Sequence, residues 1–207
     1  MSNHPAKCLA EARARDFKES EIDPANRTLD RFQANSNELI YIEGNHEARV
    51  ERSAAQMGGQ LLSVYSMISP QVNLARYRED FTWIPYNSEL PHYKIAVDLI
   101  AFHGMSISKH AQSVNLGKLR SISGVSGHTH HQQLATGRIA WTERPLKAWS
   151  PGCLCKYQPF YMHQNPSDWV HGFDLIYVKD DLSEWTNFTL TISGGETILP
   201  SGKTVRA

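Results

Sequence analysis

The sequence predicts a layered α/β fold with a β-rich C-terminal half. Over the first two thirds of the chain, a short apolar strand, a histidine-bearing turn and a helix recur in that order. The last third contains β-prone segments with a more antiparallel character. No internal repeat or low-complexity segment interrupts this pattern. A core of stacked strands and helices is therefore expected.

The first elements follow from helix-start and strand patterns. The opening forty residues favour helix: Asp23 precedes a proline at a helix start, and Leu29 and Phe32 are spaced for one buried face. Residues 38–43 form a short apolar run that predicts a buried strand, and a glycine ends it. Residues 47–57 favour helix again, with an acidic residue near the start where the helix dipole stabilises negative charge.

The middle of the chain predicts two strands that each end at histidine. Residues 58–92 mix serine, proline, asparagine and aromatics, which indicates short helices and loops. Residues 94–102 are apolar and predict one strand that delivers His103 at its C-terminal end. A polar helix over residues 108–119 then leads to a second short strand over residues 121–125, which runs into a Gly-His-Thr-His sequence.

Three further strands are expected near residues 134–142, 172–179 and 184–192. The chain has 207 residues, of which 41% are hydrophobic and 20% charged, so it is long enough to bury a sizeable core. No long linker divides it. We therefore expect one domain spanning residues 1–207.

The charge balance excludes binding of nucleic acids or acidic membranes by net charge. Lysine plus arginine and aspartate plus glutamate both number 21, so an anionic substrate must be held by local groups. The apolar stretch around residues 95–102 is interrupted by Asp98 and is too short to span a bilayer. The charged N-terminus has no secretory apolar region. These features predict a cytoplasmic protein that does not contact membranes.

The cysteines favour a reducing compartment. There are three, Cys8, Cys153 and Cys155, and an odd number argues against a disulfide framework. A Cys-x-Cys pair can bind metal, but without a second pair it is weak evidence. We interpret Cys153 and Cys155 as loop thiols.

Polar clusters follow the predicted strands. Asn45 and His46 follow the first strand, His103 the next, and His128 and His130 the third. Ligands of open α/β sheets bind beside the carboxyl ends of strands. Imidazoles and an amide oxygen suit Mn²⁺, Zn²⁺ or Fe²⁺ better than Mg²⁺ or Ca²⁺. If the Gly-His-Thr-His segment is extended, its two imidazoles point to the same side and reach neighbouring ions.

These motifs resemble those of the calcineurin-like metallophosphoesterases, in particular the small bacterial and phage members. The resemblance covers roughly residues 38–180 and implies a layered α-β-β-α sandwich. It rests on three short motifs in the right order, which match the third, fourth and fifth motifs of the family: Gly44-Asn45-His46-Glu47, His103-Gly104 and Gly127-His128-Thr129-His130.

The resemblance implies a role for each motif residue. Asn45, His103 and His128 would bind one metal ion, and His130 would bind a second. His46 would stabilise or protonate the leaving oxygen of the phosphoester, as a general acid does. The implied cofactors are divalent ions, with Mn²⁺ first and Zn²⁺, Fe²⁺ or Ni²⁺ as alternatives.

The first two motifs of the family, Asp-x-His and Gly-Asp-x-x-Asp, have no match upstream of Gly44. The aspartates in that region are Asp16, Asp23 and Asp30, and none follows a glycine. The resemblance therefore implies an N-terminally truncated domain that carries half of a two-metal site. Loss of central strands would leave an open sheet edge, which predicts a homo-oligomer or a complementary chain.

The sequence is compatible with two functions. One is a metal-dependent phosphoesterase that hydrolyses phosphodiesters or phosphomonoesters, such as nucleotides or nucleic acid. The other is a catalytically inactive remnant that acts as a metal-binding or interaction module.

Overall fold

The structure is a computed structural model, and it divides the chain into two compact units, Met1–Pro91 and His92–Ala207. The prediction of one domain over the whole chain stays a prediction. None of the helices in the described part of the chain is long and apolar enough to cross a membrane. The structure describes residue 19 and residues 22–56, 69–75, 78–139, 145–157 and 167–206.

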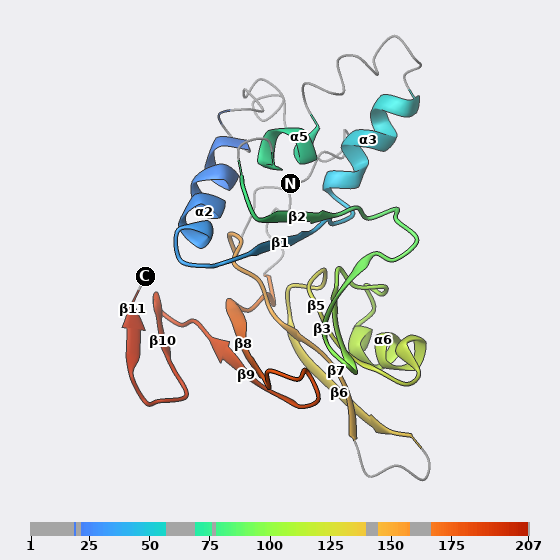
Figure 1. The fold of residues 1–207 in the computed structure, drawn as a ribbon, viewed down its shortest axis with the longest axis vertical. Helices are drawn as coiled ribbons and strands as arrows, with labels where there is room; N and C mark the ends of the chain where they lie inside the picture. The colour runs from blue at the N-terminus through green and yellow to red at the C-terminus, as the bar shows by residue number, and fades with distance from the viewer. Residues whose placement is uncertain are drawn as a thin grey trace. The chain divides into compact units, whose positions relative to one another are not determined.

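The first unit is built on two parallel strands with helices between them in sequence (Figure 1). β1 and β2 pair in parallel, with Leu39 opposite Phe81 and Ile42 opposite Ile84. The described elements of this unit are α2 (Asp23–Gln33), β1 (Leu39–Ile42), α3 (Glu47–Gln56), α5 (Pro70–Ala75) and β2 (Phe81–Ile84).

An apolar cluster joins the helices of the first unit to its strands. Ile22, Leu29 and Leu74 are its buried members, and aromatic residues of both strands pack against them. Tyr41 of β1 stacks on Trp83 of β2 with ring centroids 4.5 Å apart. This cluster fixes β1, and so the turn that follows it.

The second unit contains a mixed five-stranded sheet in the order β3-β4-β5-β7-β6. β4, β5 and β7 are parallel to one another, while β3 and β6 are antiparallel edge strands. Two antiparallel ribbons, β8-β9 and β10-β11, follow. The elements are β3 (His92–Ala96), β4 (Leu99–Phe102), α6 (Ala111–Leu119), β5 (Ser123–Ser126), β6 (Gln132–Arg138), β7 (Pro145–Pro151), β8 (Gly172–Val178), β9 (Trp185–Thr191), β10 (Glu196–Ile198) and β11 (Thr204–Arg206).

α6 covers one face of this sheet. It packs against β5, β6 and β7 (Figure 1). A Cβ added at Gly124 of β5 would lie 2.7 Å from the ring of Phe102 and 2.8 Å from the side chain of Leu119 at the end of α6. A glycine in β5 therefore lets the helix approach the sheet closely.

The β8-β9 ribbon covers the opposite face. Successive side chains of a strand alternate between the two faces, and Val125, the neighbour of Gly124, packs into a cluster with Trp149 and Trp185. The two tryptophans stack with centroids 5.5 Å apart. Trp149 is 2% exposed, and its indole nitrogen donates a hydrogen bond to Asp174 of β8 at 2.5 Å. Burial raises the pKa of Asp174 against the effect of that bond.

A mixed α/β fold is therefore observed. Within the second unit a helix, a five-stranded sheet and a β-ribbon form three layers; the α-β-β-α arrangement stays a prediction. Most predicted elements are confirmed with shifted ends, including the antiparallel strands after residue 170. β2, β7, β10 and β11 were not predicted from the sequence.

The prediction of one strand over residues 94–102 is wrong. Residues 92–102 form a hairpin of β3 and β4, with Val97 and Asp98 in its turn. Asp98 accepts a hydrogen bond from the indole nitrogen of Trp185 at 2.9 Å, and its carbonyl accepts one from the Ser123 amide at 2.8 Å. The charged residue that interrupts the apolar run therefore marks a turn.

We expect alanine substitutions at Gly124 in β5 and Gly117 in α6 to change the stability in opposite directions. Gly124→Ala should lower the free energy of unfolding by about 1–3 kcal/mol, because the new methyl overpacks a buried site. Gly117→Ala in α6 should raise it by about 0.5–1 kcal/mol, because no atom lies within 4 Å of the new Cβ and alanine favours helix. Urea unfolding of both variants checks this; equal effects would contradict the packing of α6 on β5.

Candidate metal centre

The Asn45-His46 turn connects β1 to α3 and is held by a helix cap. Glu47 accepts a hydrogen bond from the Gly44 amide at 3.1 Å and one from the Tyr41 hydroxyl at 3.4 Å. Gly44 lies at the N-cap position, and Glu47 follows it by three residues. A glutamate at this position that accepts a hydrogen bond from the N-cap amide is half of a capping box. The cap fixes the turn between Gly44 and Glu47, and so the backbone of Asn45 and His46.

A buried carboxylate ties the same turn to β2. Glu43 is 6% exposed and accepts a hydrogen bond from the Tyr86 amide at 2.8 Å. Burial raises the pKa of Glu43, the negative charges of Glu51 and Glu47 raise it further, and the Tyr86 hydrogen bond opposes them. Burial, aided by Glu47, also raises the pKa of Tyr41. The hydrogen bond of Glu43 therefore joins the end of β1 to the loop that follows β2.

In the second unit, the structure brings His103 and His128 into direct contact. β4 and β5 are parallel neighbours, with Phe102 opposite Ser126. The next residues of both strands therefore leave the sheet at the same edge. Nε2 of His103 lies 2.8 Å from Nδ1 of His128, and the ring centroids are 4.6 Å apart in an edge-to-face arrangement.

Gly104 makes this approach sterically feasible. Its φ is +123°, and a Cβ at this position would lie 2.9 Å from the Cβ of His128. Residues other than glycine rarely adopt this backbone conformation. The glycine after His103 is therefore needed for the loop to pass His128.

A buried polar network anchors both histidine loops to α6. Asn115 and Gln112 are 1% and 2% exposed, and both bond the hydroxyl of Ser126, the last residue of β5. The side-chain oxygen of Asn115 also accepts a hydrogen bond from the Met105 amide, two residues after His103. Buried networks with satisfied partners restrict the groups that they join.

The Gly-His-Thr-His segment is not extended, so the expectation that its two imidazoles share one side is not supported. His128 and His130 have φ values of +68° and +62°, which is the left-handed region. The Thr129 amide bonds the Gly127 carbonyl at 2.8 Å. The two imidazoles accordingly meet different partners.

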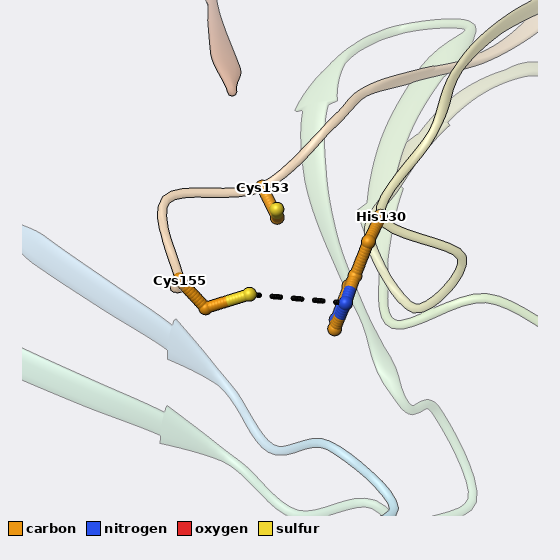
Figure 2. A group of neighbouring side chains, drawn as sticks. All are labelled: His130, Cys153 and Cys155. Carbon is orange, nitrogen blue, oxygen red and sulfur yellow. Dashed lines mark hydrogen bonds between the residues drawn. The ribbon is translucent and has the colours of Figure 1, made fainter. Parts of the chain in front are cut away.

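His130 lies beside Cys153 and Cys155, and not beside His103, which contacts His128. Its Nδ1 is 3.8 Å from Sγ of Cys155 (Figure 2). A ring nitrogen of His130 and both thiol sulfurs lie within 4.8 Å of one another. The ring of Trp169 meets the His130 imidazole edge-to-face at 4.1 Å. Partial burial of the thiol, with Cys153 adjacent, raises the pKa of Cys155 to about 12.

The His103–His128 contact has a spacing that suits a shared cation. One of the two nitrogens carries the proton between them, and the tautomer decides which. If two nitrogens bind one ion with an N–metal–N angle of about 90° and metal–nitrogen distances of about 2.1 Å, they lie about 3.0 Å apart. A metal that replaced this proton could therefore be bound if the rings turned by about 45° relative to the line between the two nitrogens, so that both lone pairs point to the ion.

The structure places the predicted site residues in two groups. Asn45 and His46 belong to the first unit, and the three histidines belong to the second. Their roles as metal ligands or catalytic acid stay predictions. The sequence interpretation missed two sets of residues: the α6 amides that anchor the loops, and the cysteines beside His130. Polar residues three apart on one helix, Gln112 and Asn115, could have indicated the first set.

No protein-family model matches the chain, and no curated protein matches it. Among solved structures, the chain is similar to the crystal structure of a single mutant of Vps29 from Entamoeba histolytica. The identity is 16% and the TM-score 0.31, over 82% of this chain and 96% of that one. This likeness is too low to carry an argument about fold or function.

Alanine substitutions at Gly104 and Gly127 form a matched pair that tests the contact between His103 and His128. Gly104→Ala should cost more than about 1 kcal/mol of unfolding free energy, because alanine is strained at positive φ and its Cβ would collide with His128. In Gly127→Ala the new Cβ would lie 3.9 Å from the nearest atom, the His103 carbonyl, so the cost should be smaller. Urea unfolding measures the costs, and histidine ring NMR shifts should change for His103 and His128 in Gly104→Ala alone. Unchanged shifts there would contradict the contact.

Proposed function

We propose that the chain contributes to a metal-dependent phosphoesterase site, in which His103 and His128 bind one divalent ion. The observation that supports this most is the 2.8 Å approach of the two ring nitrogens at the ends of adjacent parallel strands. The resemblance in the motifs adds Asn45 to this ion and His130 to a second.

The proposed reaction is hydrolysis of phosphodiesters or phosphomonoesters, with nucleotides or nucleic acid among the substrates. The ions, when bound, would supply a hydroxide nucleophile and neutralise phosphoryl charge. His103 and His128 would hold and orient the ion, and the α6 network would keep their loops in place. His46 would donate a proton to the leaving oxygen. Mn²⁺ is the proposed ion, with Zn²⁺, Fe²⁺ or Ni²⁺ as alternatives.

A second candidate is a metal-binding or interaction module without hydrolytic activity. The observation that favours it is the pair of thiols beside His130, because thiolate ligands are typical of structural zinc sites. In this case a homo-oligomer or a complementary chain would be the partner, and no phosphoester would be hydrolysed.

The two candidates differ in the behaviour of His46 and His103. In Mn²⁺ with bis(p-nitrophenyl) phosphate, His46→Ala should lower turnover by about 100-fold or more and leave manganese content unchanged, because it removes only a proton donor. His103→Ala should lower both. His110→Ala is the control, because His110 is exposed at the start of α6. Elemental mass spectrometry and initial rates measure these effects.

Two results would count against the phosphoesterase. Loss of metal together with activity in His46→Ala would contradict its role as a proton donor. No turnover in the unmutated chain with manganese bound would favour the non-hydrolytic module.

A further inference from the structure

The described part of the second unit contains a group of metal-ligating side chains outside the His103–His128 pair. A ring nitrogen of His130 and the sulfurs of Cys153 and Cys155 all lie within 4.8 Å of one another. Figure 2 shows Cys155 pointing toward the His130 ring from the loop that also carries Cys153. Three soft or borderline ligand atoms therefore lie close together.

The spacing is close to that of a tetrahedral zinc site. With Zn–S of about 2.3 Å and Zn–N of about 2.0–2.1 Å, sulfur and nitrogen ligands are about 3.6 Å apart, and two sulfurs are about 3.8 Å apart. Cys155 and His130 are separated by 3.8 Å. The remaining pairs need to close by about 1 Å or less, which side-chain rotation can supply.

A short segment between Val170 and Gly172 fixes both ligand loops relative to each other. The Val170 amide bonds the His130 carbonyl at 3.0 Å, and the Val170 carbonyl accepts a bond from the Cys153 amide at 2.9 Å. The Gly172 amide bonds the Cys153 carbonyl at 3.1 Å. One residue thus links the backbones of His130 and Cys153 directly.

The residue before Cys153 must be glycine for this arrangement. Gly152 has a φ of +102°, and a Cβ there would lie 2.2 Å from the Val170 carbonyl oxygen. That carbonyl is the one that accepts the Cys153 hydrogen bond. The close approach therefore positions Cys153 toward His130.

Aromatic contacts hold the other ligands. Trp169 packs edge-to-face against the His130 ring, which limits its rotation. His171 bonds the Cys155 carbonyl through Nε2 at 2.6 Å, and its ring stacks on Tyr157 with centroids 3.6 Å apart. Each of the three ligands thus has a neighbour that restricts it, as outer partners of metal ligands do.

We infer that His130, Cys153 and Cys155 form a zinc-binding site, separate from the His103–His128 pair. Two thiolates and an imidazole select Zn²⁺ over Mn²⁺ or Mg²⁺, which prefer oxygen-rich shells. Three protein ligands leave the fourth tetrahedral position for water or an incoming ligand. This site does not rest on phosphoesterase activity, and it gives His130 a zinc ion in place of the second phosphoesterase ion that the motif resemblance implies.

Cobalt is the probe for thiolate ligation, because tetrahedral Co²⁺ replaces Zn²⁺ and gives a thiolate-to-metal charge-transfer band in the near ultraviolet. The reduced chain should develop this band with one equivalent of Co²⁺ and lose it when Zn²⁺ is added. Cys153→Ser, Cys155→Ser and His130→Ala should each weaken Zn²⁺ affinity by at least about 100-fold, since even loss of an outer partner costs 10–100-fold.

Matched controls separate this site from the proposed phosphoesterase. Cys8→Ser removes the remaining cysteine of the chain and should retain the band, as should His110→Ala. His103→Ala should also retain it, whatever its effect on hydrolysis. A band that persists in both Cys153→Ser and Cys155→Ser, or is absent from the unmutated chain, would overturn the inference.

A second measurement uses the unmutated chain, so it does not depend on folding of the variants. With zinc bound, Cys153 and Cys155 should resist alkylation, and a chelator should restore their labelling. The labelling of Cys8 should be the same with and without zinc. Mass spectrometry of peptides gives the labelled fraction of each thiol. Equal labelling of Cys153 and Cys155 with and without zinc would contradict their role as ligands.

Discussion

The parallel pairing of β4 with β5 is the constraint on which the rest of the candidate site depends. It sets Phe102 opposite Ser126, so both histidine loops leave the sheet at one edge. Gly104 then allows the loops to approach closely, and Gln112 and Asn115 anchor them to α6. A shift of this register by one residue would send the side chains of the strand to the opposite faces and separate the imidazoles.

Local sequence patterns predicted the elements that carry their own signals. The strand before Gly44, the helix after it and the strands after residue 170 depend on apolar runs, helix propensity and turn residues, and all are present. The hairpin in residues 92–102 was missed because the apolar residues of β3 and β4 follow one another closely and Asp98 alone marks the turn. β7 was missed because its pattern of burial depends on packing between β5 and β6.

The candidate metal ligands also divide into those that local sequence patterns predicted and those that depend on contacts with distant residues. Histidine after a strand, followed or preceded by glycine, is visible in the sequence, and it predicted His103 and His128 at strand ends. That the two would share an ion was implied by the motif resemblance. The thiols could not be placed beside His130, because that contact depends on Val170, which bonds both loops from a distant part of the chain. Nor could the left-handed conformation of His128 and His130 be predicted, since only a few per cent of non-glycine residues have positive φ values, even though histidine is enriched among them.

The most direct test of the central claim is a crystal structure of the chain soaked in Mn²⁺, with anomalous diffraction used to locate the ion. The account predicts an anomalous peak about 2.1–2.3 Å from Nε2 of His103 and Nδ1 of His128, in place of the hydrogen bond between these nitrogens. An intact hydrogen bond with no peak beside it, at saturating manganese, would contradict the claim that the two histidine loops form a metal site.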